Sequence, residues 1–180
     1  MVVQAYILIQ TDVGKAAEVA KAIAKVEKQM GKGLGDPADP LLVSVRSGAK
    51  FSMPGMMDTV LNLGLNETTL TGLVALTGNE RFGWDAYRRF IQMFGKIVLG
   101  VSGDLFEDAL EARREASGVA SDPELEPADL QDLVTTFKGI VAEHAGVPFP
   151  QDPAEQLQYA IQAVFESWNG RRARRYRELE

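Results

Sequence analysis

The residues of this chain best suited to chemistry lie close together, between Arg46 and Asp58. Arg46 follows a short apolar run, and the stretch after it holds two serines and two glycines, among them Ser52 and Gly55. Small residues let backbone N–H groups come close to an anion, and a guanidinium offers a fork of donors to phosphate oxygens. The stretch therefore favours a phosphate site. The alternative is an ordinary glycine turn beside an arginine that caps carbonyl groups.

Other candidate sites are weaker. The segment GKGLGD, which begins at Gly31, lacks the GxxxxGK[ST] spacing of a Walker A loop. His144 is the only histidine and the chain has no cysteine, which excludes disulfides, thiolate catalysis and metal sites built from cysteine or several histidines. We interpret His144 as a capping or solvent-facing residue, and Asp108 and Glu111 as part of a solvated face. No catalytic residue and no metal site is predicted.

Two predicted strands position the phosphate stretch. Leu41–Val45 is an apolar run typical of a buried strand and ends directly before Arg46, and Thr59–Leu65 is compatible with a second strand. Before them, Val2–Ile9 predicts a strand and Lys15–Met30 an amphipathic helix. Three glycines and two prolines predict a loop at Gly31–Pro40.

The rest of the chain has the 3.6-residue period of helices. Asn66 or Thr69 can cap the first of them, and a stripe of aromatic residues in the second is predicted to form core. Helices are expected at Asn66–Leu76, Arg81–Leu99, Asp104–Ala116, Ala128–His144 and, with Pro153 in its first turn, Glu155–Trp168. The predicted class is α+β, with a small sheet near the N-terminus and a larger helical part after it.

Length and composition narrow the classes of function. A chain of 180 residues with 46% hydrophobic residues suits one domain with a substantial core. A net charge of -6 argues against nucleic-acid binding. The five arginines between positions 171 and 177 are interpreted as a solvated helix end, with contact to phosphate or RNA as the alternative. No membrane span or secretory signal is recognised, so a cytoplasmic location is expected.

Three blocks of sequence resemble, in this order, the nucleotide-binding domain of the pyruvate, phosphate dikinase family. They are LLVSVRSGAKFSMPGMMDTVLNLGLN, TGNERFGWDAYRRFIQMFGKIVLGV and PFPQDPAEQLQYAIQAVFESW. The resemblance runs from about residue 27 to residue 180. It implies a partial ATP-grasp-like domain that binds Mg-ATP and phosphorylates a histidine of another domain, from which pyruvate takes the phosphoryl group to give phosphoenolpyruvate.

The same resemblance implies roles for individual residues. Arg46 matches the family arginine that contacts the nucleotide phosphates. The loop from Ser52 to Asp58 matches a glycine-containing loop that lies over them, with Gly55 at the closest approach. Ser52, Gly55 and Asp58 therefore join Arg46 as predicted nucleotide-binding residues.

The sequence also departs from the family pattern. A glycine-rich segment with a nucleotide-binding lysine does not precede Leu41, and the family's acidic metal ligands, a glutamine and the TSH-type phosphohistidine motif have no counterpart here. The ending GRRARRYRELE only partly follows the family's NPRAxxYR pattern. We therefore expect a chain that is not catalytically complete alone, with the missing groups supplied by the remaining dikinase domains or by a companion chain.

Residues 1–26 resemble a different family. MVVQAYILIQTDVGKAAEVAKAIAKV is similar to the first strand and helix of the effector-binding domain of leucine-responsive-type transcription regulators. The expected division is thus a βα unit at 1–26 and a partial dikinase domain at 27–180, joined within a helix as in a fused, recombined or engineered chain. The exposed edge of Val2–Ile9 could also pair two copies into a homo-oligomer.

The sequence thus predicts an ATP-binding fragment of a dikinase, whose parent enzyme is a phosphotransferase. The alternative is a non-catalytic chimeric or scaffold protein that acts through interaction.

Overall fold

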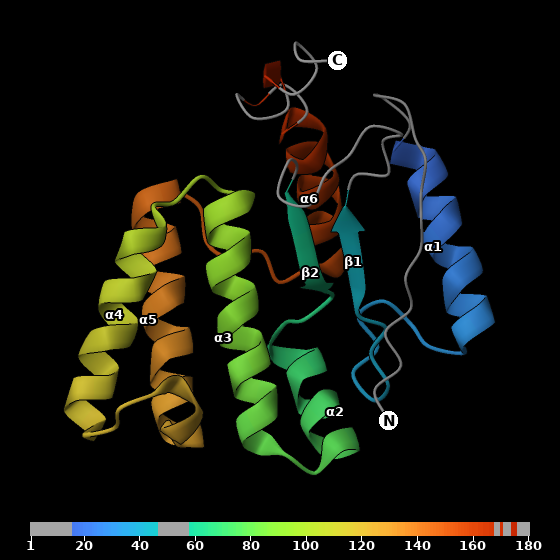
Figure 1. Ribbon diagram of the computed structural model, residues 1–180. Coiled ribbons are helices and arrows are strands. Elements are labelled where there is room, and N and C mark those ends of the chain that lie inside the picture. Colours follow the sequence, from blue (N-terminus) through green and yellow to red (C-terminus); the bar gives the residue numbers. More distant parts are fainter. Residues whose placement is uncertain (1–15, 47–57, 168–169, 171–173, 176–180) are drawn as a thin grey trace.

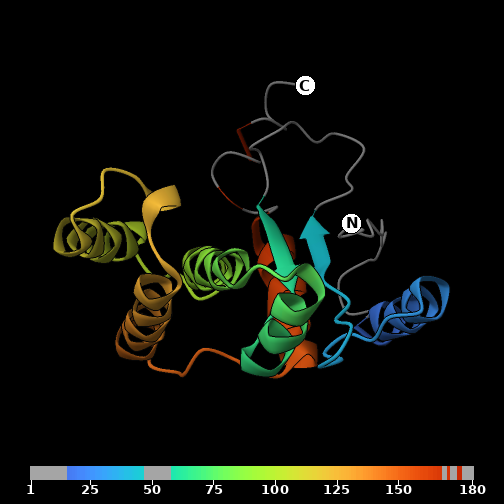
Figure 2. The same ribbon diagram turned by 90° about the horizontal axis from the view of Figure 1, so that it is seen from below.

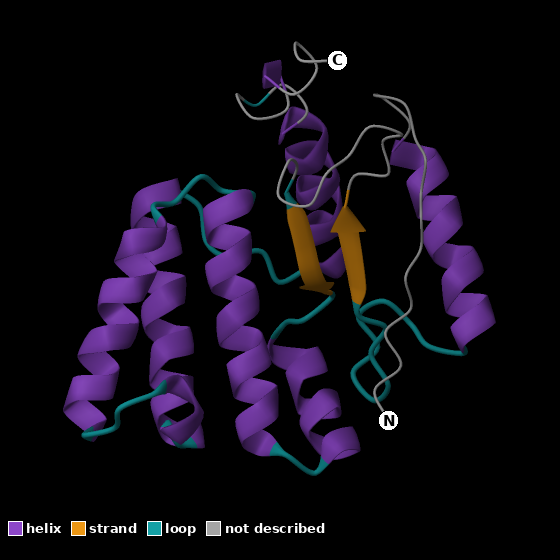
Figure 3. Ribbon diagram, in the orientation of Figure 1, coloured by secondary structure: helices purple, strands orange, loops and turns teal. Residues whose placement is uncertain are grey.

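The computed structural model describes residues 16–46, 58–167, 170 and 174–175. Its helices and strands are coloured by type in Figure 3. In chain order they are α1 (Ala16–Met30), β1 (Val43–Arg46), β2 (Thr59–Leu63), α2 (Glu67–Thr77), α3 (Glu80–Ile97), α4 (Gly103–Ser117), the 3-10 helix η1 (Asp122–Glu124), α5 (Pro127–Ala145) and α6 (Pro153–Ser167). The predicted α+β class, with a small sheet and a larger helical part, is confirmed.

The strands β1 and β2 form an antiparallel hairpin, which is the two-stranded sheet of the described part of the chain. Helix α6 packs against both strands, and α3 packs against β2 (Figure 1). Val43, Val60 and Leu63 belong to the core, so one face of the hairpin is buried. The hairpin is thus fixed to the helical part through apolar contacts.

Helix α3 is the centre of the helical part and contacts α2, α4 and α5. Seen from below in Figure 2, α4, α5 and α3 follow one another, the hairpin with α2 and α6 comes next, and α1 lies at the opposite side. The predicted aromatic stripe of α3 is core: Tyr87, Phe90, Ile91 and Phe94 are fully buried. Phe149 meets Tyr87, Phe90 and Phe94 edge to face, with ring centroids 5.5 to 6.3 Å apart.

Asparagine caps start the two helices that follow the hairpin. The side chain of Asn66 accepts a hydrogen bond from the N–H of Thr69 at 2.8 Å, and the Thr69 hydroxyl accepts one from the N–H of Asn66 at 2.9 Å. Asn79 caps α3 by accepting from the N–H of Phe82 at 2.9 Å. Of the two caps predicted for α2, Asn66 is therefore the one that the chain uses.

The predicted loop at Gly31–Pro40 contains no helix or strand, although Gly33 and Pro40 form an isolated bridge. The carboxylate of Asp36 accepts hydrogen bonds from the N–H groups of Ala38 and Asp39 at 2.7 and 3.1 Å. Helix α2 packs tightly on this loop, because a Cβ atom at Gly72 would lie 2.1 Å from the Pro37 carbonyl oxygen. The loop therefore ties α1 and β1 to α2.

The five predicted helices between Lys15 and His144 are confirmed, with ends that differ by at most two residues. The last helix ends at Ser167 in the structure, and the predicted strand Val2–Ile9 and Trp168 lie outside the described residues. The second strand is shorter than predicted, because Gly64 takes a left-handed backbone with φ of 101° and leaves the ladder.

Candidate functional site

The loop end of the hairpin, which we define by Arg46, Asp58 and Thr59, carries two of the predicted nucleotide-binding residues. Arg46 is the last residue of β1 and is exposed, and it pairs with Thr59 across the hairpin. Asp58 directly precedes Thr59 and is also exposed. The structure therefore brings Arg46 and Asp58 to the same end, whereas Ser52 and Gly55 lie outside the described residues. In Figure 1 the loop end points the same way as the C-terminal end of α6.

The opposite end of the hairpin is anchored by Gln156, a fully buried residue of α6. Its side-chain oxygen accepts a hydrogen bond from the N–H of Gly64 at 3.0 Å. Its side-chain nitrogen donates to the carbonyl oxygens of Leu65 and Pro150, each at 2.9 Å. Because every polar atom of this buried amide has a partner, the exit of β2 is held firmly against the start of α6.

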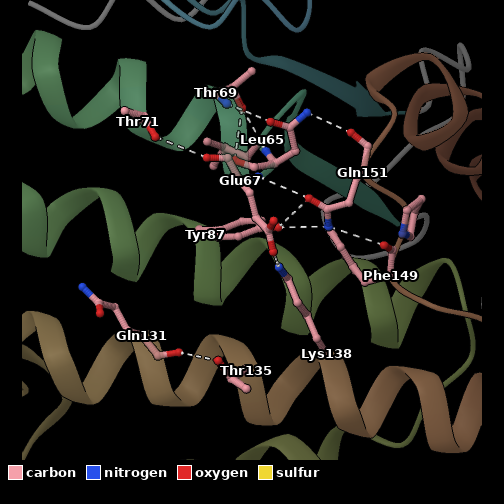
Figure 4. Close-up of polar contacts among 12 residues, drawn as sticks. Leu65, Glu67, Thr69, Thr71, Tyr87, Gln131, Thr135, Lys138, Phe149 and Gln151 are labelled. Atoms are coloured by element: carbon pink, nitrogen blue, oxygen red, sulfur yellow. Dashed lines mark hydrogen bonds and ion pairs between the residues drawn. The ribbon is translucent and has the colours of Figure 1, made fainter.

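A second polar cluster joins α2, α3 and α5 beside this anchor (Figure 4). The phenol of Tyr87 exchanges hydrogen bonds with the side-chain amide of Gln151 at 3.1 to 3.2 Å. The backbone oxygen of Gln151 accepts from the side chain of Asn66 at 2.8 Å. Lys138 pairs with Glu67 at 2.5 Å, and its ammonium lies 5.0 Å from the centre of the Tyr87 ring.

The electrostatics of this cluster indicate a structural role. Burial raises the pKa of Tyr87, while its hydrogen bond to Gln151 and the nearby charge of Lys138 act in the opposite direction. The phenol therefore stays neutral and serves as a hydrogen-bonding group. The cluster holds the segment 149–151 against α2 and α3 and carries no activated nucleophile.

Arg88 is a charged residue of α3 whose burial the helical pattern did not predict, and it is 2% exposed. Its guanidinium donates to the Asp85 carboxylate at 2.6 and 3.1 Å and to Gln92 at 3.2 Å, and a carboxylate oxygen of Asp122 lies 3.6 Å away. The segment around η1 covers this face of α3, because Arg81 binds the carbonyl oxygens of Asp122 and Leu125. Asp85, three residues before Arg88, was the feature of the sequence that could have indicated this ion pair.

The remaining candidates stand where the sequence predicted. His144 is exposed in the last turn of α5, and Asp108 and Glu111 are exposed on α4. Within the described ranges, no group of three or more histidine, aspartate or glutamate residues is placed to hold a metal ion. Within the same ranges, no helix is long and apolar enough to cross a membrane.

Comparison with known proteins identifies the family of this chain. A family model described as "Pyruvate phosphate dikinase, AMP/ATP-binding domain" matches residues 7–180. The chloroplastic pyruvate, phosphate dikinase of Mesembryanthemum crystallinum is 52% identical over 170 residues, which are 94% of this chain and 18% of the relative. The pyruvate, phosphate dikinases of Giardia intestinalis (52% identical) and Zea mays (its form 2, 51% identical) each match 92% of this chain over 166 residues.

The match covers most of this chain but a small part of each relative. The chain spans 18 to 19% of the length of these three curated relatives, so it corresponds to one part of a much larger protein. The family model covers the hairpin, its anchor at Gln156 and the whole helical part. The chain therefore belongs to the family of the AMP/ATP-binding domain of pyruvate phosphate dikinase.

Proposed function

We propose that the loop end of the hairpin binds the phosphate groups of ATP, with Arg46 as the principal contact. The observation that carries this proposal is the position of Arg46: it is exposed at the end of a strand in which Val43 belongs to the core and Val45 packs against it. A guanidinium on a fixed backbone loses little freedom on binding, and its fork of donors matches phosphate oxygens. The family description, an AMP/ATP-binding domain, supports the choice of an adenine nucleotide.

We propose that Asp58, Ser52 and Gly55 also contribute to this site. Asp58 lies beside the strand pair formed by Arg46 and Thr59 and is thus within the neighbourhood of a phosphate bound there. Ser52 and Gly55 belong to the connection between β1 and β2, and we propose that their backbone N–H groups contact the phosphates. Magnesium would arrive on the nucleotide, since Mg²⁺ keeps most of its waters and binds phosphate oxygens readily.

The activity of the whole protein is a further proposal. Relatives named pyruvate, phosphate dikinase are about five times as long as this chain. We propose that this chain is the part of such a phosphotransferase that takes up ATP, while the phosphohistidine and the site for pyruvate belong to other domains or to a companion chain. The residues described here then bind and orient the nucleotide without completing phosphoryl transfer.

Calorimetric titration of the 180-residue chain tests the proposed binding. Mg-ATP should release heat and saturate, whereas adenosine, which has the same base and sugar but no phosphate, should bind at least about 10-fold more weakly because the contacts are to phosphate. Equal affinities for Mg-ATP and adenosine would place the contacts on the base. Absence of heat at millimolar Mg-ATP would remove the proposed function.

A further inference from the structure

The hairpin has an irregular register between its anchored end and its loop end. Val43 pairs with Leu63, but two residues later Val45 pairs with Val60 and Arg46 with Thr59. Strand β2 therefore places two residues, Leu61 and Asn62, opposite the single residue Ser44 of β1. This is a β-bulge, with its extra residue in β2.

The bulge changes which side chains of β2 face the core. Val60 and Leu63 are both fully buried, although they lie three residues apart. In a regular strand, residues an odd number apart point to opposite faces of the sheet. The extra residue resets the alternation, so that both side chains reach the core while Leu61 between them is 43% exposed.

Asn62 provides the backbone geometry of the bulge. Its φ is 58°, and it is the non-glycine residue with positive φ in the described part of the chain. Asparagine tolerates this left-handed conformation better than most residues, whereas β-branched residues resist it strongly. A bulge also bends its strand and increases the local twist. The bend lies between the end held by Gln156 and the loop end that carries Arg46.

We infer that Asn62 is a positioning residue for Arg46. Its left-handed backbone builds the bulge, and the bend of the bulge sets the direction in which the loop end of the hairpin presents the guanidinium. The exposed backbone N–H of Leu61 supports the bent path by donating to the sulfur of Met93 in α3 at 3.4 Å. The inference rests on the proposed function only in taking the ligand of Arg46 to be a nucleotide phosphate.

Deletion of Asn62 tests the bend of the hairpin separately from its strand pairing and its buried face. Without this residue, one residue of β2 would lie opposite Ser44, so the pairs of Val43 with Leu63, Val45 with Val60 and Arg46 with Thr59 can all form in a regular ladder. Val60 and Leu63 become two residues apart and therefore still share one face. The deletion thus preserves strand pairing and core burial while it removes the bulge.

The deletion variant should fold with a thermal midpoint close to that of the wild type, yet bind Mg-ATP at least about 10-fold more weakly, which corresponds to about 1.4 kcal/mol. The side-chain Nε–H resonance of Arg46 is expected to shift when Mg-ATP is added to the wild type, and it should shift much less in the deletion variant. A folded deletion variant with wild-type affinity would overturn the inference.

Two substitutions test the same point without a change in chain length. N62G keeps the left-handed conformation and should bind Mg-ATP like the wild type, whereas N62V opposes it and should bind at least about 5-fold more weakly. The control is L110A in α4, which removes a buried side chain remote from the hairpin and should lower the thermal midpoint without changing affinity. Wild-type affinity in folded N62V would contradict the assignment even if the deletion variant failed to fold.

These experiments also distinguish failure of this inference from failure of the proposed function. If the wild type did not bind Mg-ATP, the proposed function would fail, and the inference would be judged from crystal structures of the wild type and the deletion variant. An Arg46 side chain that leaves the hairpin in the same direction in both structures would then overturn it.

Discussion

Arg46 shows how far a single residue can be interpreted from sequence. Its place after an apolar run predicted an arginine directly after a buried strand. In the structure Arg46 is the exposed last residue of β1, whose first residue, Val43, is buried. Asp58 was predicted through the family resemblance, and the pairing of Arg46 with Thr59 brings it to the same end of the hairpin. The contributions of Ser52 and Gly55 stay predictions.

Replacement of Arg46 by alanine should weaken binding of Mg-ATP by about 1 to 3 kcal/mol, the range expected for a lost charge-assisted hydrogen bond. R89A is the matched control, because Arg89 is also an exposed arginine, with 60% of its side chain accessible, but lies on α3 beside Asp85. Calorimetry on both variants gives the comparison. Equal affinity in R46A and R89A would exclude Arg46 from the site.

Asp129 gives a prediction about pH at the residue scale. The hydrogen bond from the Ser117 hydroxyl lowers the pKa of Asp129, and the N–H of Glu126 and the charge of Arg113 act in the same direction. A carboxyl whose pKa is lower in the folded than in the unfolded state stabilises the fold above its ordinary pKa of 3.8, and this contribution is lost as the pH falls through the folded value. D129N should therefore lose less stability than the wild type between pH 6 and pH 3, roughly the window that brackets this titration.

Urea unfolding at these two pH values measures the effect. Asp132 is a suitable control, because it is exposed on the same helix and Arg113 contacts it as well. If D132N flattened the pH dependence as much as D129N, the hydrogen bonds of Asp129 would not be the cause.

At the scale of elements, periodicity predicted the helices well, because their buried stripes repeat every three to four residues. It could not predict the bulge, since the run from Thr59 to Leu65 contains apolar residues on both faces and no pattern that marks an extra residue. Gln156 was also missed. A glutamine in an amphipathic helix usually faces water, and its burial depends on polar backbone groups supplied by β2 and by Pro150.

Gln156 should therefore be important for the stability of the hairpin. Q156A leaves the N–H of Gly64 and the carbonyl oxygens of Leu65 and Pro150 without their buried partner, and should reduce the free energy of unfolding by about 3 kcal/mol. Q158A is the control, since Gln158 is exposed on the same helix. Chemical unfolding of both variants tests this, and similar losses in Q156A and Q158A would contradict the anchoring role.

At the scale of the whole molecule, two groups of polar contacts join parts that are distant in the sequence. Gln156 and Gln151 connect the last helix and the segment before it to the hairpin and α2, and Arg88 connects α3 to the segment around η1. These contacts could not be predicted from sequence, because each depends on partners more than 30 residues away or on an unexpected burial. The three blocks that carried the family resemblance, in contrast, were sufficient to identify the family.

The predicted division at residue 26 stays a prediction. Helix α1 runs without a break from Ala16 to Met30 across the predicted junction, and its Ile23 and Val26, both on the N-terminal side of that junction, contribute to the core. The family match begins at residue 7 and so includes most of the segment that resembles a regulator domain. Pairing of two copies through Val2–Ile9 also stays a prediction, which sedimentation of the chain at several concentrations would examine.

The central claim is that ATP phosphates bind at the loop end of the hairpin. Its most direct test is a Mg-ATP titration of the ¹⁵N-labelled chain followed by amide and arginine side-chain resonances. Saturable shifts are expected at Arg46, Asp58 and Thr59 and in the segment between the strands, and no comparable shifts are expected in α4 and α5. Shifts confined to the helical part, or unchanged spectra at millimolar Mg-ATP, would contradict it.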